Sequence, residues 1–129
     1  MDKNLINISK IETFFNALLD NKVSENTFFT SLPDIKTEWQ EIVVVDLAKS
    51  IEDMNAYGRG VVLVYLYAKP LSTGGKNVAK ISEMEKKLNE CISSNTDEHY
   101  KITRKSTYTD YDENKNLHCN IVEIDLIIL

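Results

Sequence analysis

Residues 61–68 read VVLVYLYA, the longest apolar run in the chain. Alternate side chains of a β-strand point to opposite faces, and here both sets are apolar. One set is Val62, Val64 and Leu66, and the other is Val61, Leu63, Tyr65 and Tyr67. A strand of this kind is typically buried on both faces. We therefore expect a helix layer over one face, and another subunit is a candidate for the second cover.

A strand is also predicted just before this run. Residues 41–48 are rich in β-branched side chains that favour extended backbone. We interpret residues 50–60 as a polar connection between the two strands, ending in Tyr57-Gly58-Arg59-Gly60. Pro70 ends the apolar run because proline cannot donate to a sheet.

Two segments, residues 8–21 and 78–92, have the spacing of amphipathic helices. In each, apolar side chains recur at three- and four-residue steps, and in the second they oppose lysines and glutamates. Residues 22–40 show no clear period. We expect there either a short strand or an irregular segment packed over the core.

The last third of the chain reads as a long β-hairpin with arms at residues 99–109 and 116–128. In the second arm the apolar parity changes at Ile121-Val122, which indicates either a β-bulge or burial of both faces. The first arm is polar on both faces over residues 103–107. We therefore expect the tip half of the hairpin to project beyond the core.

The predicted element order is α-β-β-α-β-β over 129 residues, a length that suits one domain spanning residues 1–129. Antiparallel hairpins and two amphipathic helices predict an α+β fold. We expect an antiparallel or mixed sheet of about four to five strands with both helices on one face.

The charge balance argues against a nucleic-acid binder. The chain has 15 basic and 20 acidic residues and a formal net charge of −5, whereas such binders need a concentrated basic face. We see no secretory signal and no apolar run of the roughly 20 residues that a membrane helix needs. With only two cysteines, the sequence favours a reducing, cytoplasmic setting.

The sequence offers no support for catalysis. The candidate soft metal ligands are His99, His118, Cys91 and Cys119, and adjacent residues of a strand point to opposite faces, so His118 and Cys119 do not share one ion. Neither cysteine has the cationic or helix-terminal context that lowers a thiol pKa. Nucleophile-elbow and metalloprotease motifs do not occur. We expect no enzymatic activity, no metal and no cofactor.

The two-sided apolar strand and the polar hairpin instead favour partner contacts through a sheet face or edge. The predicted subunit-contact residues are Tyr65 and Tyr67 on the central strand and Thr107, Tyr108 and Tyr111 on the hairpin. Arg59 is a candidate for pairing with acidic residues of a neighbour.

This order of elements resembles the tail-terminator and tail-completion (head–tail joining) proteins of long-tailed phages and prophages. The resemblance rests on the helix at 8–19, the hairpin of 42–48 with 61–67, the helix at 78–92 after a Pro/Gly loop, and the closing strands that end in 121–129. It implies a non-enzymatic structural protein that forms a ring, commonly hexameric, on the end of the tail tube. Such a ring stops tube polymerisation and provides the surface on which the head docks.

The resemblance thus implies a homo-oligomer whose partners are the tail tube or a head-connector protein, located in the cytoplasm of a bacterial host or in the virion. The alternative is an intracellular protein-binding module, such as an immunity- or adaptor-like domain, whose recognition edge is the same hairpin. A small-molecule enzyme ranks third, because it would need a deep pocket with convergent polar groups.

Overall fold

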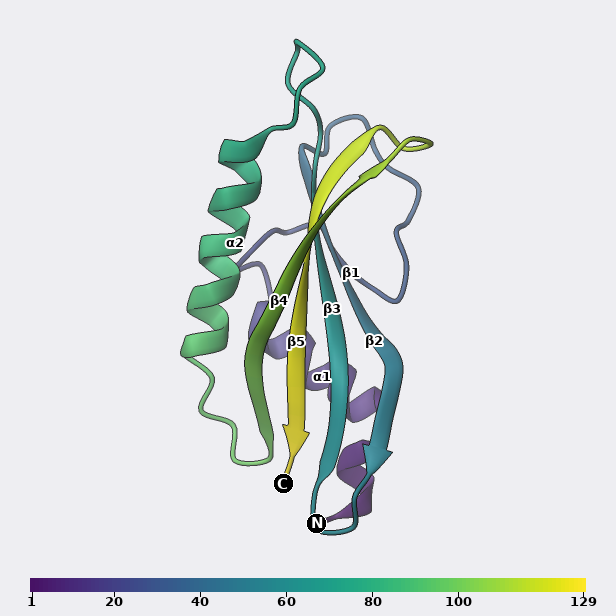
Figure 1. Cartoon of the computed structure of the whole chain (residues 1–129), viewed down its shortest axis with the longest axis vertical. Coiled ribbons are helices and arrows are strands. Elements are labelled where there is room, and N and C mark those ends of the chain that lie inside the picture. Colours follow the sequence, from purple (N-terminus) through teal and green to yellow (C-terminus); the bar gives the residue numbers. More distant parts are fainter.

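The computed structural model describes residues 1–47 and 51–129. Its elements are η1 (Lys3–Ile6), α1 (Ile8–Leu19), β1 (Thr27–Phe29), β2 (Glu41–Asp53), β3 (Gly58–Ala68), α2 (Val78–Ser93), β4 (Tyr100–Asp112) and β5 (Leu117–Ile128). The strands form one five-stranded sheet in the order β1-β2-β3-β5-β4 (Figure 1). Only β1 and β2 run parallel, and the other pairs are antiparallel. The predicted α+β class is confirmed.

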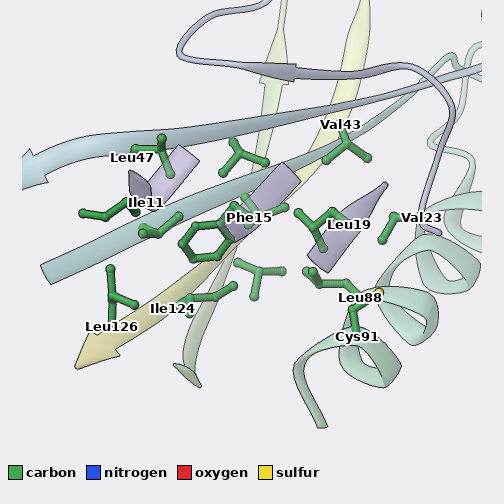
Figure 2. Packing of buried hydrophobic residues seen from close by; sticks show 14 of the residues in the cluster. Ile11, Phe15, Leu19, Val23, Val43, Leu47, Leu88, Cys91, Ile124 and Leu126 are labelled. Carbon is green, nitrogen blue, oxygen red and sulfur yellow. The ribbon is translucent and has the colours of Figure 1, made fainter. Parts of the chain in front are cut away.

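Both helices pack on the same face of the sheet, which we call the inner face. Phe15 of α1 is fully buried at the centre of this layer (Figure 2). The cluster takes Ile11 and Leu19 from α1, Met84, Leu88 and Cys91 from α2, and alternate residues of β2, β3 and β5. Each helix begins at an asparagine whose side chain accepts a backbone N–H, Asn7 from Ser9 and Asn77 from Lys80.

The prediction for residues 50–60 is wrong in part. β2 continues to Asp53 and β3 begins at Gly58, so the connection is a tight turn at residues 54–57. Asp53 Oδ1 accepts the Asn55 N–H at 2.8 Å, and the Met54 N–H donates to the Tyr57 carbonyl at 2.9 Å. Mostly polar residues extend the strand here because they pair with β3. Ser50 lies outside the described residues.

The opposite, outer face is covered over one half by the chain itself. Both alternatives for residues 22–40 occur, because the three-residue strand β1 leads into an irregular segment at 30–40, which we call the strap. Phe28 of β1 and Leu32, Ile35 and Trp39 of the strap pack on the apolar side chains Ile42, Val44, Tyr67, Leu117 and Cys119. The Lys69 ammonium also donates to the Thr37 carbonyl.

The strap explains the change of parity in β5. β5 pairs with β3 without interruption through Ile121 and Val122, so the strand itself has no bulge there. Its first residues, Leu117 and Cys119, are buried beneath the strap, whereas Val122, Ile124, Leu126 and Ile128 are buried beneath the helices. Burial of both faces is therefore the correct alternative.

The expectation that half of the hairpin projects beyond the core is wrong. β5 is paired with β3 as far as His118 opposite Ala68, so only the end of the hairpin around residues 113–116 lies beyond the sheet. β4 is polar for a different reason: it is the edge strand of the sheet (Figure 1). Edge strands expose much of their side-chain surface even where the next strand inward is buried.

Candidate interaction surface

The half of the outer face that the strap does not reach is the first candidate surface. We call it the open outer face. Its apolar residues are Val61 and Leu63 of β3 and Ile127 of β5, and Tyr65 and Ile121 lie at its border, packed against the cluster beneath the strap. All five are partly exposed. This half therefore keeps the two-sided apolar character noted in the sequence, with its second side accessible.

Charged residues on the open outer face alternate in sign from strand to strand. Lys101 and Lys105 lie on β4, Glu123 and Asp125 on β5, and Arg59 on β3 opposite Glu52 of β2. Lys105 Nζ lies 3.9 Å from Asp125 Oδ1, an oxygen that is sealed from solvent and accepts no hydrogen bond. Opposite charges on neighbouring strands attract, so this pattern stabilises the exposed sheet modestly.

Three of the six predicted contact residues lie on this outer face: Arg59, Tyr65 and Tyr108. Tyr108 is 50% exposed on β4, opposite Ile121. Arg59 is exposed, and the ion pairs formed within residues 1–47 and 51–129 do not include it. Tyr65 is partly buried, and desolvation raises the pKa of its hydroxyl.

The other three predicted residues lie elsewhere. Tyr67 is only 9% exposed because the strap covers it, and desolvation raises its pKa strongly. Thr107 and Tyr111 lie on the inner side of β4, opposite Val122 and His118. The structure therefore does not bring the six residues onto one surface.

On the inner side of β4 the two residues are engaged within the chain. Thr107 Oγ1 accepts a hydrogen bond from Arg104 at 2.5 Å, and Arg104 also pairs with Glu85 of α2. The Tyr111 ring lies 4.6 Å from the His118 ring, and its hydroxyl donates to Asn116 Oδ1 at 2.7 Å. Tyr108 and Tyr111 are an odd number of residues apart, a spacing that already separates them onto opposite faces in a regular strand.

The free edge of β4 is the second candidate surface, and sequence reasoning missed its pattern. β4 pairs with β5 along one side only. A β-bulge between Arg104 and Ser106 shifts the alternation of its side chains. As a result the outer side of β4 carries, in order, Lys101, Thr103, Lys105, Ser106, Tyr108, Asp110 and Asp112.

Both thiols are buried, and both imidazoles contact other groups of the chain. Cys91 lies in the inner core, and Cys119, 2% exposed beneath the strap, has its pKa raised to about 11 by burial. A thiol of this kind is a poor nucleophile near neutral pH. His99 Nδ1 lies 3.0 Å from the Leu129 carbonyl, and His118 packs on Tyr111.

Among the residues that the structure describes, no group of three or more His, Cys, Asp or Glu side chains has the spacing of a metal site. The same part of the chain contains no helix long and apolar enough to cross a membrane.

A shallow groove of about 560 Å³ lies beside α1. Its lining includes the apolar side chains of Leu5, Phe14 and Tyr100 together with Lys10 and Asp97. Asp97 Oδ1 already accepts the backbone N–H groups of His99 and Tyr100, at 2.8 and 2.9 Å. This carboxylate therefore holds the loop before β4, and the groove has few other polar groups to orient a ligand.

No family model matches the sequence, and no curated protein matches it significantly.

Proposed function

We propose that this chain is a non-enzymatic structural protein that works by assembling with copies of itself. The assembly is a ring that caps a phage or prophage tail tube and joins it to the head, in the manner of tail-terminator and tail-completion proteins. The observation that carries the proposal is the free edge of β4, 13 residues long, beside an outer face that is half open. Unpaired strand edges and exposed apolar sheet faces are surfaces on which protein subunits join.

Three further features support the proposal. The sheet with two helices on one face has the architecture that the resemblance implies. The two thiols are buried, and burial raises the pKa of both. The net charge of −5 suits a ring through which DNA passes without being held, since like charges repel. The proposed partners are the tail tube and a head-connector protein, in a bacterial cytoplasm or a virion.

Tail length tests this function directly. Induced cultures of the source strain, with the gene intact and with it deleted, are compared by negative-stain electron microscopy. We expect tails of uniform length with heads from the intact strain, and overlong, headless tails from the deletion strain. A plasmid copy of the gene should restore uniform tails. Particles with normal tails and heads from the deletion strain would refute the function.

The second candidate function is an immunity- or adaptor-like module. It is favoured by Arg59, which is exposed on the open outer face and forms no ion pair with the residues that the structure describes. Such a module would hold one other protein through that face. An Arg59→Glu variant should then lose a stoichiometric partner in affinity purification, and a Lys86→Glu variant on the exposed side of α2 should keep it. Loss of tail-length control on gene deletion would exclude this alternative.

A further inference from the structure

The free edge of β4 exposes backbone groups that any other strand can pair with. A strand of 13 residues is about 40 Å long, and an edge of that length is an open template for chain addition. Folded proteins blunt such edges with charges, bulges or a covering element. Here the edge has both a bulge and charges, and the order of the charges is informative.

The outer side of β4 is basic in its first half and acidic in its second. Lys101 and Lys105 precede the exposed Tyr108, and Asp110 and Asp112 follow it. Lysines alone would repel a second copy of this edge. A strand that is positive at one end and negative at the other attracts its own antiparallel copy, because reversal brings each charge to its opposite.

The bulge makes this complementarity possible. In a regular strand, Lys101 and Lys105 would lie on one face and Asp110 and Asp112 on the other, because their positions differ by odd numbers. The bulge between Arg104 and Ser106 places all four on the outer side. The Lys105–Asp125 pair and the pairing of Asp110 with Cys119, which the strap buries on the outer face, confirm that side for both halves.

We propose that two copies of this protein pair through their β4 edges as an antiparallel, two-fold dimer. With the two-fold axis between Lys105 and Tyr108, Lys101 of one copy lies opposite Asp112 of the other. Lys105 then lies diagonal to Asp110 of the other copy, within the reach of long side chains. The two Tyr108 rings lie near the axis, where aromatic residues contribute most to an interface. The same patch serves both copies, as a two-fold contact requires.

Such a dimer closes after two copies and occupies the edge that would otherwise add chains without limit. It describes the free protein and does not rest on the proposed ring. For a ring-forming cap, edge pairing would keep the free protein from assembling away from its tube.

The test is a charge exchange measured by size-exclusion chromatography with light scattering. The acidic variant is Lys101→Glu/Lys105→Glu. The basic variant is Asp110→Lys/Asp112→Asn, in which the asparagine oxygen still accepts the Lys115 N–H that Asp112 accepts at 3.0 Å. A control variant, Lys10→Glu/Lys86→Glu, makes the same net charge change as the acidic variant at exposed positions on the helices. Far-UV circular dichroism and thermal melting check that each variant is folded.

We expect the unmodified protein and the control to have twice the 14.8 kDa mass of one copy over about 1–100 μM. Each β4 variant alone should dissociate about 100-fold more readily, since it meets itself with like charges. An equimolar mixture of the two β4 variants should regain the mass of two copies. Added salt should weaken the unmodified dimer.

Three results would overturn the proposal. The first is a mass of one copy for the unmodified protein at every concentration. The second is a mixture of the two variants that stays monomeric although both are folded. The third is a larger assembly whose mass neither variant changes, which would show that copies join through a surface other than the β4 edge.

Discussion

Replacement of Trp39 with alanine should make the buried Cys119 thiol accessible to reagents. Trp39 belongs to the strap, its ring lies 5.3 Å from that of Phe28, and both pack in the cluster that contains Cys119. In the intact protein two effects suppress the reaction of the Cys119 thiol with such reagents. The thiol is 2% exposed, and its pKa of about 11 against an ordinary 9.0 lowers the thiolate fraction about 100-fold below pH 9. Reaction therefore requires the strap to open.

The size of the effect follows from the packing. Removal of a fully buried Trp side chain costs about 3–5 kcal/mol. Because Trp39 is partly exposed, we expect its removal to destabilise the closed strap by about 2 kcal/mol. If this loss falls on the strap, its open state becomes about 30-fold more populated, and the labelling rate rises by the same factor. Exposed residues without such contacts contribute little, so Glu38→Ala should leave the rate unchanged.

The assay is labelling by a thiol-reactive chromophore at pH 8 in a Cys91→Ala background, which leaves Cys119 as the single thiol. Circular dichroism and urea unfolding confirm that the Trp39→Ala variant remains folded under the labelling conditions. Equal labelling rates in the Trp39→Ala and Glu38→Ala variants would show that Trp39 does not hold the strap over Cys119. So would fast labelling of the protein that retains Trp39, because the strap would then not cover the outer face.

Three further predictions concern stability, measured by urea unfolding with linear extrapolation. Phe15→Ala should lower the free energy of unfolding by about 4 kcal/mol because the Phe15 ring is fully buried. Ile8→Ala, at an exposed position, should lower it by about 0.5 kcal/mol. Equal losses would contradict the burial of Phe15 in the inner core. Gly58→Ala should cost about 1 kcal/mol because its Cβ would lie 3.2 Å from Ile128 Cβ, and no loss would show that β5 shifts easily. The raised Cys119 pKa should make stability fall as pH rises from 9 to 11, by about 2 kcal/mol, because the unfolded chain loses that proton first. Cys119→Ala should reduce this slope, and an unchanged slope would show that the thiol does not cause it.

Periodicity was sufficient to predict the elements that bury one continuous stripe. α1 and α2 follow from apolar spacing, and β3 follows from the run at 61–68. The three-residue strand β1 is too short to have a detectable period, and it forms because β2 offers an edge beside it. Local sequence periodicity does not predict pairing between strands.

The segment that covers the second face of β3 was not predicted from the sequence. The sequence indicated that something must cover this face, and the structure shows that the strap covers one half of it from within the chain. The apolar side chains of the strap lack regular spacing because the segment is neither helix nor strand. Tyr67 therefore leaves the candidate surface for a reason that lies about 30 residues away in sequence.

Strand alternation could not predict the charge pattern on β4. Regular alternation assigns Lys105 and Asp110 to opposite faces, and the bulge brings them to the same side. The residue types in that segment do not indicate a bulge. The charge complementarity of the edge is thus a property of the fold, whereas the exposure of Tyr108 was expected from the sequence.

The copy number of this protein in purified tails tests whether it is a structural cap built from copies of itself. Quantitative mass spectrometry of tails from the source strain would give the number of copies per tail. We predict a fixed number, about six for one ring, that does not change with tail length. Absence of the chain from purified tails, or a number proportional to tail length, would contradict a role as a cap.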